Sequence, residues 1–122
     1  MGKGRGSANR TLVLGLAALI VMAMAQPTLA TVHYATWSYS MATWTRGKTF
    51  RAGDYIVFSY NKSLHNLVRV SGYGYNTCTR PSGSLAYQTG KDYIKLVKGA
   101  NYFLCSFPGH CKAGMKLAVY AY

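Results

Sequence analysis

The sequence predicts an all-β domain folded as a sandwich or barrel. Half of the 122 residues are hydrophobic and 14% are aromatic, so the chain has ample material for one core. Glycine and proline recur between short runs rich in aromatic and β-branched residues, as is typical of strands joined by turns. We therefore expect a β-sandwich with short helical segments. Its five clearest strands are expected at 54–60, 66–70, 93–97, 101–106 and 117–122.

The pattern within each run supports these assignments. Glycine precedes and asparagine follows the strand at 54–60, which is rich in aromatic and branched residues. Ile94 and Leu96 alternate with neighbours of mixed character, as expected of a strand with one buried face. We expect a short helix within 81–90. The residues before Trp37 do not fix the partner of a first strand.

The N-terminal segment has the pattern of a secretory signal peptide. Three basic residues precede an uncharged, largely apolar stretch at 12–25, which is short for a membrane helix. We expect cleavage after Ala30, which divides the chain into a removed segment, 1–30, and one domain, 31–122. Since no later segment resembles a lipid-anchor signal, we expect a secreted, extracellular protein with no stable membrane anchor.

The charge balance is strongly basic. The chain has 14 lysines and arginines but only two acids, Asp54 and Asp92, for a net charge of +12, and loss of the three leader cations leaves +9. Catalysis by paired carboxylates is nearly excluded, because neither aspartate lies in a recognisable motif. An acidic redox protein or an anionic wall polysaccharide is a candidate partner. We expect a monomer with no nucleic-acid partner, because no nucleic-acid motif is present.

Three metal-binding side chains follow one another at even spacing near the end of the chain. Cys105, His110 and Met115 lie on a strand, after a Pro-Gly turn, and before the return strand. Copper suits this mixture, because Cu(I) prefers sulfur and Cu(II) is well served by imidazole nitrogen. His65, beside an earlier strand, supplies a second imidazole. The sequence therefore predicts one copper ion held by these four residues.

The sequence has three cysteines, an odd number, so one disulfide would leave one cysteine unpaired in a secreted protein. Cys78, Cys105 and Cys111 allow three pairings, and spacing alone does not choose among them. If Cys105 binds metal, Cys78 and Cys111 are left to form a disulfide. That link would close the loop 78–111 and stabilise the fold by roughly 3 to 4 kcal/mol.

The stretch 102–116 reads Tyr-Phe-Leu-Cys-Ser-Phe-Pro-Gly-His-Cys-Lys-Ala-Gly-Met-Lys. It resembles the copper-binding motif of the plant phytocyanins, and of their plantacyanin, or basic blue, group in particular. Further resemblance lies at 47–54, 60–66 and 75–78. The resemblance covers about residues 37–122, which is nearly the whole expected domain.

The resemblance implies a cupredoxin-like Greek-key β-sandwich and secretion to the extracellular matrix. It implies a blue copper protein that transfers single electrons to a small or protein redox partner, and not an enzyme. Methionine at position 115 is similar to plantacyanins and uclacyanins, whereas stellacyanins have glutamine there. The implied site is a type 1 copper ion held by His65, Cys105, His110 and Met115, with a Cys78–Cys111 disulfide.

Other functions remain open at this point. A structural zinc site made by Cys78, Cys105, His110 and Cys111 is awkward, because two of its ligands are adjacent in the chain. A cysteine nucleophile lacks a supporting motif. The main alternative is a basic extracellular adhesion or signalling protein in which copper is mainly structural.

Individual residues outside the copper motif receive simpler interpretations. His33 is expected to be structural or exposed rather than a ligand, and Trp37 and Trp44 are expected in the core or at its rim. Asn61-Lys62-Ser63 forms a glycosylation sequon, so Asn61 is a predicted glycan site.

Overall fold

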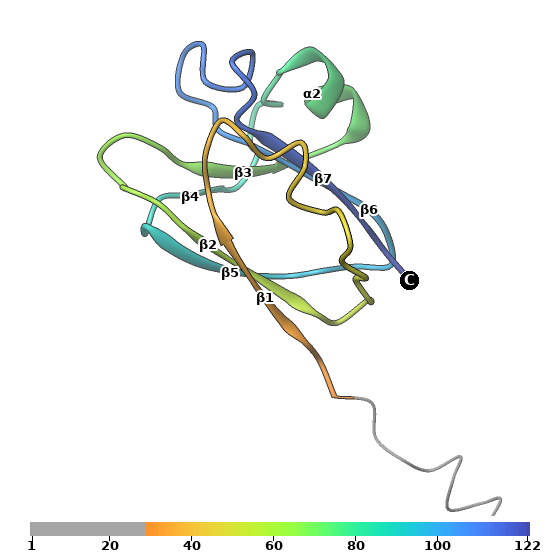
Figure 1. The fold of residues 1–122 in the computed structure, drawn as a ribbon. Coiled ribbons are helices and arrows are strands. Elements are labelled where there is room, and N and C mark those ends of the chain that lie inside the picture. Colours follow the sequence, from red (N-terminus) through yellow and green to blue (C-terminus); the bar gives the residue numbers. More distant parts are fainter. Residues whose placement is uncertain (1–28) are drawn as a thin grey trace, which may run out of the picture.

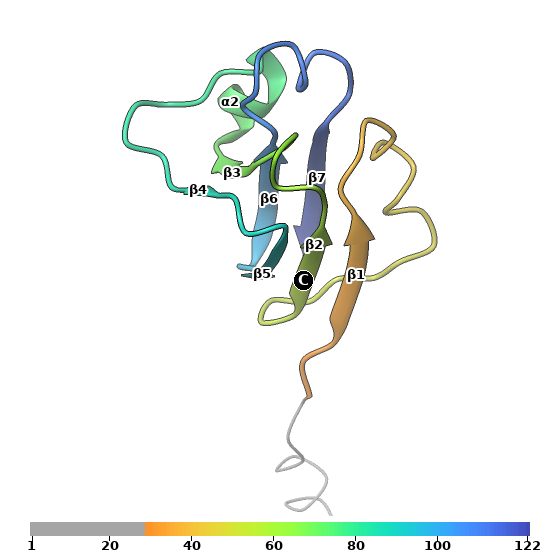
Figure 2. The same ribbon diagram turned by 90° about the vertical axis from the view of Figure 1, so that its left-hand side faces the viewer.

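The computed structural model describes residues 29–122, which fold into two packed β-sheets (Figures 1 and 2). The signal segment expected at 1–30 thus lies almost wholly outside the described residues. One sheet has the order β1-β2-β5 and the other the order β4-β3-β6-β7. The strands are β1 (Val32–Thr36), β2 (Tyr55–Ser59), β3 (Leu67–Val70), β4 (Ala86–Tyr87), β5 (Lys91–Lys95), β6 (Gly99–Leu104) and β7 (Lys116–Ala121). The predicted all-β sandwich is confirmed.

All five expected strands are present, and no end is shifted by more than two residues. The shift is two residues in β6, which was expected at 101–106 and spans 99–104, and in β5, which was expected at 93–97 and spans 91–95. Its buried face is the expected one, since Ile94 and Leu96 are buried and Tyr93 is exposed. The strand begins earlier because Asp92 is also buried, where its carboxylate accepts hydrogen bonds from Tyr60 and Thr89.

The partner of the first strand, which the sequence left open, is β2. The two strands run parallel, with Val32 opposite Tyr55. Asp54, one residue before β2, fixes the beginning of β1: its carboxylate accepts from the Thr31 amide at 3.0 Å and lies 3.0 Å from His33 Nε2. The Arg51 amide donates to the same carboxylate at 2.9 Å. Burial alone would raise the pKa of Asp54, but these hydrogen bonds outweigh it and lower the pKa.

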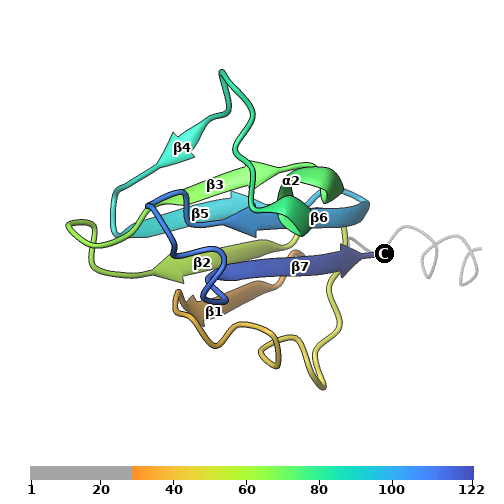
Figure 3. The ribbon, with the colours of Figure 1, turned by 90° about the horizontal axis from the view of Figure 1, so that it is seen from above.

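The helix expected within 81–90 is not there, since that segment holds a turn and the short strand β4. The helix is instead α2 (Gly72–Thr77), which lies next to β6 (Figure 3). Ser71 caps it, accepting from the Gly74 amide at 3.2 Å. The sequence suggested turns here because glycine is a poor helix former. Gly74 is needed for close packing, because a Cβ would lie 2.7 Å from the Thr79 carbonyl oxygen.

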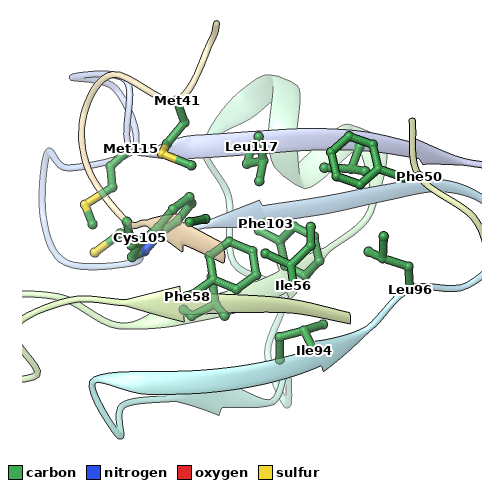
Figure 4. Packing of buried hydrophobic residues seen from close by; sticks show 14 of the residues in the cluster. Met41, Phe50, Ile56, Phe58, Ile94, Leu96, Phe103, Cys105, Met115 and Leu117 are labelled. Carbon is green, nitrogen blue, oxygen red and sulfur yellow. The ribbon is translucent and has the colours of Figure 1, made fainter. Parts of the chain in front are cut away.

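The main core lies between the two sheets (Figure 4). Phe58 from β2 and Phe103 from β6 are fully buried, with ring centroids 5.1 Å apart. Trp37 packs edge-on against Phe58, and Trp44 packs at the rim, as expected. Among residues 29–122, no helix is long and apolar enough to cross a membrane.

Candidate metal centre

The link between β6 and β7 brings Cys105, His110 and Met115 to one end of the sandwich. Cys105 directly follows β6, and Met115 directly precedes β7. The Cys105 amide donates to the Met115 carbonyl at 3.1 Å, and the Met115 amide donates to the His110 carbonyl at 3.0 Å. In Figures 1 and 2 the connection between β6 and β7, coloured blue, lies beside α2 and away from the end where the chain enters β1.

Three of the four predicted ligands converge here, including His65 from the segment before β3. The Nδ1 atoms of His65 and His110 are 3.2 Å apart, and Cys105 Sγ is 3.4 Å from His110 Nδ1. The donor atoms of all three residues lie within 4.8 Å of one another. The thiol is fully buried, whereas the imidazoles are half-buried.

Met115 is also buried at this end of the core. Figure 4 shows its thioether turned toward the sulfur of Cys105. Its role as a fourth ligand stays a prediction, because the group of converging donor atoms established above comprises only His65, Cys105 and His110.

The converging donors fit a single copper ion. Donors bound to one small ion at about 2.0 to 2.3 Å in a trigonal set lie roughly 3.5 Å apart, close to the two distances above. Two imidazoles and one thiolate, with a weak axial methionine, are the donor set of blue copper sites. A zinc site that uses Cys78 and Cys111 is ruled out, because those two residues are joined to each other in a disulfide.

The electrostatic surroundings keep the His65 imidazole available for metal. Burial lowers the pKa of His65, and the positive charge of a protonated His110 would lower it further. The neutral imidazole is the form that binds metal, so both effects favour ligation. Of the acids in residues 29–122, Asp54 and Asp92 are buried and hydrogen-bonded elsewhere in the fold.

The disulfide predicted between Cys78 and Cys111 is confirmed, with a Cα–Cα distance of 5.7 Å. Cys105 is the free cysteine. The disulfide joins Cys78, which follows α2, to Cys111, which follows His110. The β6–β7 connection that carries His110 is therefore attached to the helix. His33 lies in the hydrogen bond with Asp54 described above, as a structural residue.

Asn66 is a functional residue that the sequence did not reveal. Its buried amide donates to Ser106 Oγ at 2.7 Å, and its Oδ1 accepts from the Ser106 amide at 2.8 Å. Asn66 follows His65 and Ser106 follows Cys105, so these two hydrogen bonds tie the two ligand-bearing segments together. A polar residue entering a buried strand was the available signal, because such a side chain needs partners.

Tyr39 is a second residue that the sequence did not single out. Its ring lies edge-on to both imidazoles, with centroids 5.8 Å from His65 and 5.4 Å from His110. The segment around Tyr39 approaches the ligand link closely at Gly114, where φ is +108° and a Cβ would lie 2.5 Å from the Tyr39 carbonyl oxygen. Glycine is therefore required there.

The fold and the donor set together define a cupredoxin-like blue copper protein, the class of copper-binding electron carriers. A family model described as a plastocyanin-like domain matches residues 32–115. The chain belongs to this family, and within it to the phytocyanins.

Curated relatives and solved structures agree with this assignment. The chain is 43% identical over 125 residues to a chemocyanin of Lilium longiflorum and 42% identical over 128 residues to a basic blue protein of Arabidopsis thaliana. Each match covers 99% of both chains. Among solved structures, cucumber basic protein, a blue copper protein, is 47% identical with a TM-score of 0.73. Spinach plantacyanin is 49% identical with a TM-score of 0.70, and each match covers 75% of this chain and all of the solved one.

Proposed function

We propose that the protein is a secreted type 1 copper protein that carries single electrons in the extracellular matrix. The convergence of Cys105, His65 and His110 is the observation that carries this proposal. Copper bound there would supply one-electron chemistry between Cu(II) and Cu(I). The protein's own part is to hold the donors in one arrangement for both oxidation states, which favours fast electron exchange.

The rigidity of the ligand segments supports this role. The disulfide holds the link that carries His110, and the Asn66–Ser106 hydrogen bonds join the segments of His65 and Cys105. Two aromatic rings border the half-buried imidazoles: that of Tyr39, which is exposed, and that of Phe107, whose centroid lies 5.7 Å from that of His110. We call these two rings the aromatic rim. A small or protein redox partner would approach the ion at this rim.

We propose Met115 as a weak axial ligand. It is buried beside Cys105, and a thioether is a soft donor that favours Cu(I). A Met115→Gln variant should keep its copper but have a lower reduction potential, because an oxygen donor favours Cu(II). Voltammetry of the two copper-loaded proteins tests this, and equal potentials would contradict axial ligation. We propose no enzymatic activity, because four protein donors leave no coordination position for a substrate.

Secretion is supported by the leader pattern and by the disulfide, since such links persist in oxidising compartments. Expression of the full chain in plant cells should place the protein in the medium or wall fraction with a new N-terminus near position 31. Retention of an intact N-terminus inside the cells would contradict secretion. Asn61 is exposed, and its predicted glycan would appear in the same sample as a mass shift that is lost in Asn61→Gln.

An anionic wall polysaccharide is proposed as a partner. In residues 29–122, no lysine or arginine forms a salt bridge, so no carboxylate of the described chain neutralises these side chains. Reversible one-electron voltammetry of the copper-loaded protein tests electron transfer itself. If wall binding persists in a folded copper-free variant and no reversible current is found in the wild type, the adhesion function replaces electron transfer.

A further inference from the structure

A cavity of about 280 Å³ lies beside the disulfide and is separate from the ligand imidazoles. The segment 104–109 lines one part of it, and the Cys78–Cys111 disulfide lines another. Arg80 and Lys112 complete the lining. His65, His110, Met115 and Tyr39 do not line it, so the cavity lies beside the rim at which a redox partner would meet the imidazoles and shares Phe107 with that rim.

The charge of this cavity is positive and uncompensated. Arg80 and Lys112 are both exposed cations, and no salt bridge engages either of them within the described chain. The guanidinium of Arg80 donates one hydrogen bond to the Ser84 carbonyl at 3.0 Å, which orients it and leaves other donors available. A guanidinium presents its donors in a planar fork that matches a carboxylate.

The rest of the lining is mixed and includes an apolar part. Phe107 and Pro108 contribute hydrocarbon surface, and the disulfide contributes polarizable sulfur. A bare inorganic anion would leave this surface unused, whereas an anion with a flat apolar body would cover it. Pockets for drug-sized ligands occupy about 300 to 1,000 Å³, so a cavity just below this range suits a smaller compound with a single ring.

We propose that this cavity binds small aromatic carboxylates, with the carboxylate between Arg80 and Lys112 and the ring against Phe107, Pro108 and the disulfide. A compound bound there would lie against the chain segment that carries Cys105. The site goes beyond the proposed electron transfer, because its lining contains no copper-binding atom exposed to the ligand: Cys105 itself is 0% exposed.

Titration with sodium benzoate at constant ionic strength tests the proposal. The copper-loaded protein in its reduced, diamagnetic form is labelled with ¹⁵N and followed by NMR. We expect saturable shifts of the backbone amides of Ser106, Phe107, Gly109 and Lys112. Absence of saturable shifts at these amides would overturn the proposal, and the blue spectrum of the oxidised sample reports separately on the copper site.

Paired variants separate this cavity from a general effect of positive charge. Arg80→Gln combined with Lys112→Gln should raise the dissociation constant of benzoate at least tenfold, because it removes both expected carboxylate contacts. Lys95→Gln combined with Lys98→Gln removes the same charge outside the cavity lining and should change it less than twofold. Equal weakening in the two double variants would show a nonspecific charge effect and overturn the site.

Two further probes test the chemistry of the ligand. Benzyl alcohol keeps the ring without the charge, and acetate keeps the charge without the ring. Each should bind at least tenfold more weakly than benzoate if both halves of the cavity contribute. Binding of either compound as tight as that of benzoate would overturn the proposed ligand class.

Discussion

The two ends of the sandwich use histidine in opposite ways. Where the chain enters β1, His33 is half-buried and lies 3.0 Å from the carboxylate of Asp54. At the ligand end, His65 and His110 are equally half-buried, but their nearest polar neighbours are each other and the thiol of Cys105. The degree of burial therefore does not distinguish the structural histidine from the ligand histidines. The polar groups that each imidazole contacts do.

This difference shows how a ligand residue can be recognised from its polar contacts alone. At the β1 end, the polar groups satisfy one another, since the Asp54 carboxylate also accepts two backbone amides. At the ligand end, the donor atoms of His65, Cys105 and His110 lie close together, and each can donate an electron pair to a metal. A bound metal ion would satisfy all three. The first end contributes stability, and the second provides the chemistry.

The largest expected effect comes from Cys105→Ser, which removes the thiolate from the ligand end. We expect complete loss of the intense blue absorption, because a serine hydroxyl is not a soft anionic donor. Visible spectroscopy after copper loading measures this, with circular dichroism as the check of folding. A blue band that persisted in the folded variant would refute the site.

Replacement of Cys78 and Cys111 by alanine together tests how the ligand end is held. We expect the free energy of unfolding to fall by about 2 to 5 kcal/mol, with weaker copper retention, because the link carrying His110 loses its attachment to α2. Urea denaturation of the copper-free proteins measures the first effect, and dialysis against a chelator measures the second. Equal unfolding midpoints would speak against the structural role of the disulfide.

Asp54→Asn tests the opposite end. We expect a loss of about 1 to 3 kcal/mol at pH 7, because charge-assisted hydrogen bonds to the carboxylate are weakened. Folding lowers the pKa of Asp54, so the carboxylate stabilises the fold above its unfolded pKa, and this stability is lost as the pH falls toward the folded pKa. The difference between wild type and variant should therefore shrink below about pH 4.

The blue spectrum of Asp54→Asn is its internal control. It should match that of the wild type, because Asp54 contributes to the β1 end alone. A stability difference that stayed constant down to pH 2 would contradict the assigned role of the carboxylate.

The smallest effect is expected for His33→Gln, which should cost about 1 kcal/mol or less and leave copper binding intact. The matched variant His110→Gln should reduce copper retention strongly at little cost to the fold of the copper-free protein. Metal analysis of both purified proteins measures the contrast. If His33→Gln lost as much copper as His110→Gln, the assignment of His33 as structural and His110 as a copper ligand would be contradicted.

Apart from His65 and the Cys78–Cys111 disulfide, for which the family resemblance was available, the sequence revealed the residues whose chemistry is local and missed those defined by distant contacts. The motif from Cys105 to Met115 lies within one strand connection, so its convergence could be foreseen from spacing. The pairing of β1 depends on Asp54, more than twenty residues from Thr31, and the Asn66–Ser106 bonds span 40 residues.

Helix placement failed for a related reason. The glycines of α2 lower its local propensity, and the helix forms because it packs against β6 and is capped by Ser71. The segment 81–90 is largely exposed, and its residues Ala86–Tyr87 pair with β3.

The most direct test of the copper site is the visible and electron-spin-resonance spectrum of residues 31–122 loaded with one equivalent of Cu(II). Two imidazoles and a buried thiolate around one ion predict an intensely blue solution that bleaches on one-electron reduction and recovers on reoxidation. A colourless sample, with copper bound elsewhere or not at all, would contradict the account.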